Sequence, residues 1–417
     1  MRSEDFRRPT TPGRLEPTRF LERRFGQKGP EVHPVVGVGY VPDDLPAGVT
    51  KTGIAAGIQD NLLAAEGNLC LLEGRARNIL NPGMLIGAFA HKEAVHSSAI
   101  ENTFASEKQL VLFDADPTAV EPSRQPEVRE VNNYLRALRH GFDAREPVCL
   151  RLMREMHAIL MEGVTRTAGV PGQFRKAQNA IGNPSAPFKD AKFVPPPPEF
   201  VDPCLNRLEA FIHARDDLPL LVRIALVHYQ FETIHPFDDG NGRLGRLLVS
   251  LQLCKHGRLS APLLYISGFF DRHRQDYTEL LYRVSSEGCW TEWINFFLSA
   301  VATQARDAFL RVEKMEALRA DFHARVRRKR ASGMLPKIVD SLFDRPAFTV
   351  AQVAKLTGMG AASANRLVRQ LEESGIITEA TGRKHSRVFM AEPVLDVMTE
   401  ILSHEPEPQP PAPSARA

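Results

Sequence analysis

The chain of 417 residues has few of the features that mark secreted, membrane or redox proteins. Its five cysteines are an odd number, widely separated, and form no Cys-x-x-Cys pair, which argues against a zinc ribbon or a redox dithiol and favours a reducing compartment. No segment offers about 18 uninterrupted apolar residues, and the N-terminal MRSEDFRRPTTPGRLEP lacks an apolar signal core. We therefore expect a cytoplasmic protein without a membrane partner.

The chain also has little net charge. A formal charge of +3 excludes binding of polyanions by the protein as a whole and leaves room only for a local basic face. With 43% hydrophobic and 25% charged residues, the composition is that of a globular protein. The length exceeds what one hydrophobic core usually serves, so we expect two or three domains.

Most of the chain carries apolar residues at spacings of three and four, which predicts a mainly α fold. One Gly- and Pro-rich segment, residues 172–200, interrupts the helices, and AKFVPPP within it predicts a short hairpin. The expected divisions are a partly ordered N-terminal arm with short extended pieces (1–50), a helical region (51–145), a helical core (146–300), a helical linker (301–335), a C-terminal module (336–396), and the end of the last helix with a disordered Pro-rich tail (397–417).

The C-terminal module has the order helix, helix, helix, hairpin, which fits a winged helix-turn-helix. Its third helix carries polar side chains that could enter a major groove, and basic residues near the hairpin turn lie where a wing would contact DNA phosphates. These residues are Ser363, Asn365, Arg366, Arg369, Arg383, Lys384 and Arg387. Residues 336–396 nevertheless contain eight Lys or Arg and seven Asp or Glu, without the excess of a dedicated DNA-binding domain. DNA and another protein therefore stay alternative partners.

The stretch 235–246, HPFDDGNGRLGR, carries residues that core packing does not need. Gly240, Asn241 and Gly242 leave backbone N–H groups free at the start of a helix whose N-terminal end is positive, which predicts an anion cradle. The sequence is not a Walker A loop, because GxxxxGK[ST] is missing, and it does not follow a strand as a Rossmann fingerprint does.

Charged residues in the same stretch extend the cradle. Arg243 and Arg246 share one helix face and can grip phosphate oxygens in pairs. Asp238 and Asp239 would repel phosphate unless a cation intervened, and Mg²⁺ is commonly held by one carboxylate plus phosphate oxygens. His235 can be neutral near pH 7 and accept a proton from an attacking hydroxyl. The alternative, aspartates that cap the next helix and a histidine that packs locally, explains each residue singly but not all together.

This stretch resembles the signature HPFx[D/E]GNGRxxR of the Fic (filamentation induced by cAMP) family and matches every specified position. The resemblance covers roughly residues 50–300. It implies a Fic-type helical core with a short hairpin flap. It also implies transfer of AMP from ATP to a Tyr, Thr or Ser hydroxyl of a protein target, or of the protein itself, with pyrophosphate leaving.

The resemblance assigns roles position by position. His235 would be the general base, Asp239 the Mg²⁺ ligand, and Arg246 the residue that holds the terminal phosphate. Tyr277 matches a position where the family commonly places an aromatic residue near the adenine, and a core tyrosine on a helix face is the alternative. The implied nucleotide-binding residues are Phe237, which would also anchor the loop in the core, Asp238, Gly240, Asn241, Gly242, Arg243, Arg246 and Tyr277.

Two further segments are similar to the family. VPGQFRKAQNAIG followed by AKFVPPPPE looks like its GxFR segment and its flap, a hairpin that holds the backbone of a target beside the active site by strand pairing. The flap residues expected to dock a target are Lys192, Phe193, Val194 and Pro195. A stiff spacer is the alternative reading of the four consecutive prolines.

HSSAIENTF places Glu101 four residues after Ser97, on the same face of the predicted helix. Ser97 to Asn102 resembles the inhibitory motif [S/T]xxxE[G/N] of Fic proteins. In that family the glutamate pairs with the second arginine of the signature, here Arg246, and so competes with the terminal phosphate of ATP. An exposed helical glutamate is the alternative.

Two hypotheses follow. The first is an ATP- and Mg²⁺-dependent protein adenylyltransferase inhibited by Glu101, with transfer from another phosphorylated donor as a variant. The second is a DNA-binding transcriptional regulator whose Fic core senses nucleotide. The intact signature favours the enzyme, because a pure sensor has no use for His235 as a base. The sequence is compatible with a homodimer and does not decide the oligomeric state.

Overall fold

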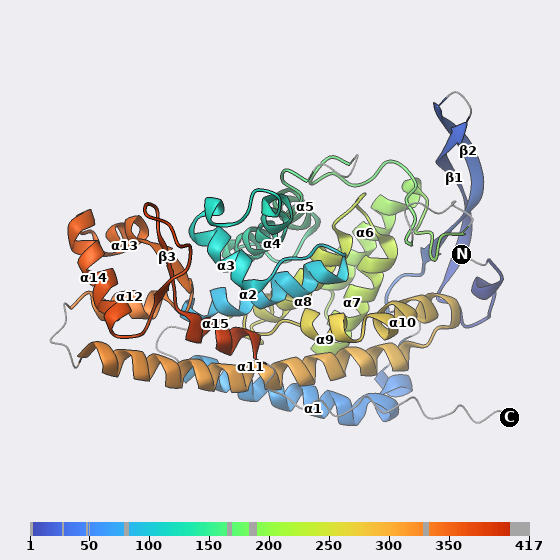
Figure 1. Cartoon of the computed structure of the whole chain (residues 1–417). Coiled ribbons are helices and arrows are strands. Elements are labelled where there is room, and N and C mark those ends of the chain that lie inside the picture. Colours follow the sequence, from blue (N-terminus) through green and yellow to red (C-terminus); the bar gives the residue numbers. More distant parts are fainter. Residues whose placement is uncertain are drawn as a thin grey trace.

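In the computed structural model, a helical body carries a β-hairpin at one end and a smaller unit of helices and short strands at the other (Figure 1). The structure describes residues 3–26, 29–46, 49, 51–78, 83–164, 169–182, 190–327 and 333–400. The prediction of a mainly helical fold is confirmed. No helix within these ranges is long and apolar enough to cross a membrane. Most of the predicted Pro-rich tail lies outside the described residues.

Two long helices, α1 (Lys51–Asn78) and α11 (Trp290–Arg327), lie side by side along one side of the body (Figure 1). The Asn61 amide donates to Asn295 Oδ1 at 2.8 Å, which ties the two helices together. Because α11 continues without a break to Arg327, most of the expected 301–335 linker belongs to a helix of the body.

The remaining helices of the body include α7 and α8, which contact each other. In chain order, these remaining helices are α2 (Gly83–Ile100), α3 (Glu107–Ala115), η2 (Pro117–Ala119), α4 (Gln125–Asp143), α5 (Leu150–Leu160), α6 (Pro198–His213), α7 (Leu220–Ile234), α8 (Asn241–Lys255), α9 (Ser267–Arg272) and α10 (Arg274–Glu287). Every residue of α8 from Asn241 to Leu253 is buried. A helix that is buried on all faces places its polar residues in the interior, so the arginines of α8 need partners there.

The N-terminal arm is more regular than expected. After η1 (Ser3–Phe6), β1 (Gly13–Gly26) and β2 (Gly29–Pro42) form one antiparallel hairpin of 14-residue strands in continuous register. Tyr40 near the end of β2 is fully buried, and its ring lies 5.6 Å from that of Phe193. The base of the hairpin therefore packs against the segment predicted to be the flap.

The C-terminal unit has the order helix, strand, helix, helix, hairpin, helix. Its elements are α12 (Leu335–Ser341), β3 (Ala347–Thr349), α13 (Val350–Thr357), α14 (Ala361–Glu373), β4 (Thr378–Glu379), β5 (Val388–Met390) and α15 (Glu392–Thr399). The strands form an antiparallel sheet in the order β3-β5-β4. The first strand was not expected from the sequence. Thr349 and Gln352 form a reciprocal capping box that starts α13.

Buried polar contacts join this unit to the body. The backbone N–H of Gly87 on α2 donates to Asp344 Oδ1 at 3.1 Å, and a side chain at position 87 would collide with the Asp344 carbonyl. Arg311 of α11 is buried, pairs with Asp307, and donates to the last carbonyls of α15. The unit is thus fixed on α2 and α11, which α15 also contacts.

Candidate active site

The predicted signature lies between two buried helices. α7 ends at Ile234, and His235 follows in the left-handed region, with φ of 49°. Gly240, with φ of 79°, precedes α8, which begins at Asn241. The loop therefore places the proposed base at the end of one helix and the predicted anion cradle at the start of the next.

Phe237 and Asn241 fix the loop from within. Phe237 is fully buried, the environment that its expected anchoring role requires. Asn241 Oδ1 accepts the Phe237 N–H, and Asn241 Nδ2 donates to the Phe237 carbonyl, both at 2.9 Å. These two bonds hold the Asn241 side chain against the Phe237 backbone, so it fixes the shape of the loop.

His157, which sequence analysis did not single out, also supports the loop. Its ring stacks on Phe237 with centroids 3.7 Å apart and an interplanar angle of 7°. His157 Nδ1 accepts the Gly172 N–H, so its Nε2 carries the proton and donates to the Asp239 carbonyl at 2.9 Å. Burial lowers the pKa of His157 to about 4, which keeps this neutral tautomer in place. The only signal in the sequence was a histidine on the apolar face of a helix.

His235 is half-buried, and its ring is neutral at physiological pH. Burial, and next the charge of Arg175, lower the pKa of His235 to about 4. His235 Nδ1 lies 3.3 Å from the Glu232 carbonyl, which can only accept, so Nδ1 carries the proton. Nε2 is left with a lone pair, as a general base requires.

The two aspartates differ in environment. Asp238 is exposed, whereas Asp239 is half-buried and its Oδ1 accepts the Gly240 N–H at 2.6 Å. Within the described ranges, no group of three or more His, Cys, Asp or Glu side chains is placed to hold a metal ion. The single carboxylate of Asp239 beside the cradle suits Mg²⁺ held largely by phosphate oxygens and water.

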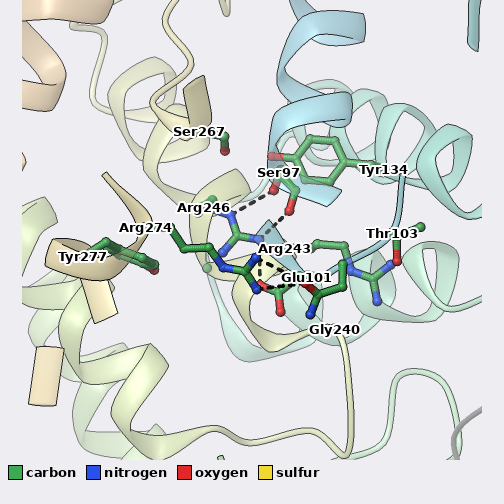
Figure 2. A network of polar contacts seen from close by, with 12 residues as sticks. Ser97, Glu101, Thr103, Tyr134, Gly240, Arg243, Arg246, Ser267, Arg274 and Tyr277 are labelled. Carbon is green, nitrogen blue, oxygen red and sulfur yellow. Dashed lines mark hydrogen bonds and ion pairs between the residues drawn. The ribbon is translucent and has the colours of Figure 1, made fainter. Parts of the chain in front are cut away.

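Arg243 and Arg246 point to different partners (Figure 2). Arg243 is fully buried, donates to Glu130 Oε1 of α4, and lies 3.7 Å from Asp239 Oδ1. Glu130 was not predicted from the sequence. Its carboxylate neutralises a charge that the core could not otherwise hold.

Arg246 bonds with the motif predicted to be inhibitory (Figure 2). Its Nε donates to Ser97 Oγ at 3.0 Å, and its Nη2 donates to the Ser97 carbonyl at 2.7 Å and to Glu101 Oε1 at 2.9 Å. Helix α2 ends at Ile100, so Glu101 lies in the turn after the helix and not on its face. Asn102, with φ of 59°, completes that turn.

The Glu101 carboxylate covers the start of α8. A Cβ atom added to Gly242 would lie 2.2 Å from Glu101 Oε1, so the carboxylate rests directly on the backbone of the first helical turn. Burial would raise the pKa of Glu101, but the charge and hydrogen bond of Arg246 outweigh it and lower that pKa below its ordinary value. A negative side chain thus occupies the position where the sequence predicts an anion.

Tyr277 lies in an aromatic cluster of the core. It is 3% exposed, its hydroxyl lies 2.9 Å from His228 Nε2, and its ring stacks on Phe270 with centroids 4.4 Å apart. This is the environment of a core tyrosine, the alternative to an adenine contact. Figure 2 shows it on the same side of the site as Arg274.

The predicted flap is short in the described part of the chain. Ile181 and Phe193 form one antiparallel bridge, and residues 183–189 lie outside the described ranges. Phe193, Val194 and Pro195 are buried, whereas Lys192 is exposed. The Val194 carbonyl accepts the Tyr40 N–H at 2.9 Å, so β2 already occupies one edge of this segment.

Comparison with known proteins gives the same family as the signature. Residues 147–253 match the Fic/DOC family. Residues 59–143 match the N-terminal model of the Fic/DOC family. The fold is similar to that of a Fic family protein from Desulfovibrio desulfuricans G20, with a TM-score of 0.51, 21% identity, and coverage of 80% of this chain and 95% of that one.

The names of the curated relatives state two activities. A probable protein adenylyltransferase of Aquifex aeolicus is 28% identical over 171 residues, which cover 39% of this chain and 48% of the relative. A uridine 5′-monophosphate transferase of Xanthomonas campestris is 32% identical over 124 residues, which cover 28% of this chain and 23% of the relative. The match thus spans less than half of each relative. These similarities support a Fic-type nucleotidyltransferase at the level of the family.

Proposed function

We propose that the protein is a protein adenylyltransferase that transfers AMP from ATP to a Tyr, Thr or Ser hydroxyl and is inhibited by Glu101. The observation that carries the proposal is the loop 235–246. On it, a neutral His235 with a free Nε2 lone pair stands five residues before Gly240, beside the positive end of α8. A base next to an anion cradle suits the attack of a hydroxyl on a phosphate.

The reaction needs few groups from the protein. The target hydroxyl oxygen bonds to the α-phosphorus of ATP, His235 Nε2 takes the hydroxyl proton, and the bond from that phosphorus to the bridging oxygen breaks to release pyrophosphate. The N–H groups at the start of α8 and the guanidinium of Arg246 hold the leaving phosphates. Asp239 would hold Mg²⁺, which neutralises phosphate charge.

Inhibition follows from the position of Glu101. Its carboxylate binds the Arg246 guanidinium and fills the space over Gly242. Glu101 and the terminal phosphates of ATP therefore cannot occupy this position at the same time. The target backbone docks on the segment from Lys192 to Pro195. Since β2 borders Val194, the arriving strand must use another part of the flap edge.

For residues 336–396 we propose a winged helix-turn-helix, with α14 as its exposed helix. Arg383, predicted to contact DNA phosphates, instead donates to the Thr118 carbonyl and hydroxyl. With this basic residue of the hairpin turn engaged within the chain, we favour a protein contact over DNA for the module. The DNA-binding regulator remains the second hypothesis.

The experiment that tests the activity uses ATP radiolabelled at either the α- or the γ-phosphate. Relative to the lysate alone, purified Glu101→Gly protein with Mg²⁺ should add label from the α-position only, and the same protein with His235→Ala should add none. Excess unlabelled ATP should suppress labelling more strongly than excess UTP. This comparison tests whether ATP is the preferred nucleotide donor. Transfer from the γ-position, or undiminished labelling by His235→Ala, would rule out the proposed chemistry.

A further inference from the structure

Arg175 is a buried arginine beside the site. The reaction described above assigns it no role. Arg175 lies between α5 and α6 and is 3% exposed. Its side chain Nε donates to the His235 carbonyl at 2.8 Å and its Nη2 to the Ile234 carbonyl at 3.3 Å, while its backbone N–H donates to the Pro236 carbonyl at 2.9 Å. Arg175 thus binds three consecutive residues around the proposed base.

The same guanidinium reaches the flap. Arg175 Nη2 donates to the Pro196 carbonyl at 2.7 Å, and Nη1 donates to the Ala177 carbonyl at 3.2 Å. The adjacent Gln178 donates to the Pro195 carbonyl at 3.0 Å. One side chain therefore connects the backbone that carries the base to the backbone at the end of the flap.

The connection matters because His235 has an unfavourable backbone conformation. A positive φ is uncommon for residues other than glycine, and a strained residue persists only where its surroundings hold it. The His235 carbonyl accepts from Arg175 and, at 3.4 Å, from Asn179. Both donors belong to the segment that leads into the flap.

Among the described residues, Arg175 also differs from the buried Arg243 and Arg246 in having no carboxylate as an ion-pair partner. Burial lowers its pKa to about 10, and the described carboxylate that opposes this effect, Asp238, is exposed and forms no ion pair with it. The positive charge of Arg175 therefore acts on His235, whereas the charges of Glu101 and Asp239 raise the His235 pKa. Burying such a charge is costly, and the four carbonyls that accept from its side chain offset part of that cost.

We propose that Arg175 is a positioning residue that sets His235 relative to the flap, so that a target segment paired with the flap presents its hydroxyl at Nε2. This inference rests on the proposed function. Lysine at this position would keep the charge but could not reach carbonyls on two sides at once, because it lacks the planar fork of the guanidinium.

The test uses Arg175→Lys and Arg175→Gln, each combined with Glu101→Gly, with transfer to a protein substrate measured against pH. Misplacement of a base commonly costs on the order of tenfold to a hundredfold, so both variants should lose at least about tenfold in kcat. Binding of ATP and Mg²⁺ should change by less than about twofold, because the cradle of α8 is intact. The acid limb of the rate profile should stay in place in Arg175→Lys and move to higher pH in Arg175→Gln.

Arg154→Lys is the matched control. Arg154 also donates to a carbonyl of this segment, that of Gly172, and to Gln173, but it makes no contact with His235. The Arg154→Lys variant, combined with Glu101→Gly, should leave the transfer rate unchanged. If neither Arg175 variant folds, Asn179→Ala removes the second donor to His235 and should lower kcat by about twofold to fivefold.

The outcomes separate the two proposals. No transfer by the Glu101→Gly parent would overturn the proposed activity itself. Transfer by the parent with an unchanged rate in Arg175→Lys would overturn the positioning role alone. A fall in nucleotide binding that equals the fall in rate would also overturn it, since it would show a general structural defect. An acid limb that does not move in Arg175→Gln would overturn it as well, since it would show that the charge of Arg175 does not act on His235.

Discussion

Arg243 and Arg246 lie three residues apart on α8 and are equally buried, but their carboxylate partners lie in different surroundings. The Glu130 side chain, which pairs with Arg243, is 7% exposed, whereas the Glu101 side chain, which pairs with Arg246, is 34% exposed. Glu130 belongs to a helix of the core and Glu101 to a turn at the edge of the site. One pair is therefore part of the scaffold, and the other is the pair that the proposed function exchanges for a phosphate.

The largest effect on stability is expected for Glu130→Ala. Removing this carboxylate leaves the buried Arg243 with only the longer contact of 3.7 Å to Asp239, which should lower the free energy of unfolding by about 3–5 kcal/mol, measured by urea denaturation. Glu127→Ala, on the same helix, is the control. Its ion pair with Arg124 is exposed, so its loss should cost under about 1 kcal/mol. Equal losses for the two variants would show that burial does not distinguish them.

Glu101→Gln should cost less and should respond to nucleotide. Because a third of the Glu101 side chain is exposed, we expect a loss of roughly 1–2 kcal/mol without ligand. ATP with Mg²⁺ should then raise the melting temperature of the variant more than that of the wild type, since a ligand stabilises in proportion to its affinity. A smaller shift in the variant would contradict competition between Glu101 and the terminal phosphate.

Arg383→Ala should have a small effect. The side chain is 36% exposed where it faces Asp116 at 3.7 Å, and exposed pairs contribute under about 1 kcal/mol. Transfer should be unchanged, because the contact lies far along the chain from the signature. A loss of transfer in folded Arg383→Ala would show that docking of the C-terminal unit controls the site.

The smallest effect is expected from mild acid, which should not release the inhibition. The Glu101 pKa is lowered in the folded protein, so the stability that this carboxylate contributes is present above its ordinary value of 4.5 and is lost only as pH falls through the lower value. His235 becomes protonated at about pH 4. The ratio of Glu101→Gln to wild-type transfer should therefore stay constant within about twofold from neutral pH down to about pH 5. Activation of the wild type in that range would contradict the assignment.

The sequence predicted the helical fold and the loop because both depend on local patterns. Helical spacing is a short-range signal, and the signature lies within twelve consecutive residues. The contact of Glu101 with Arg246, 145 positions apart, could be expected only through the family resemblance. Nothing in the spacing of the two residues indicates it.

Contacts that depend on tertiary packing could not be predicted from the sequence. Glu130 looked like any other charged residue of an amphipathic helix, and Arg175 bonds to carbonyls, which every residue has. The length and regularity of the N-terminal hairpin were underestimated, because its prolines and glycines interrupt the alternation of apolar and polar residues that marks a strand. Tyr277 could not be assigned, because a buried tyrosine and one that meets a ligand have the same spacing on a helix.

The measurement that most directly tests the central claim is transfer of α-phosphate label by four proteins: the wild type, Glu101→Gly, His235→Ala, and the double variant. Freed from Glu101, Arg246 can hold the terminal phosphate, so Glu101→Gly should label itself and its targets faster than the wild type. The double variant should not label at all, because its cradle is open but its base is missing. Labelling by folded Glu101→Gly at or below the wild-type rate, or labelling that persists in the double variant, would contradict the account.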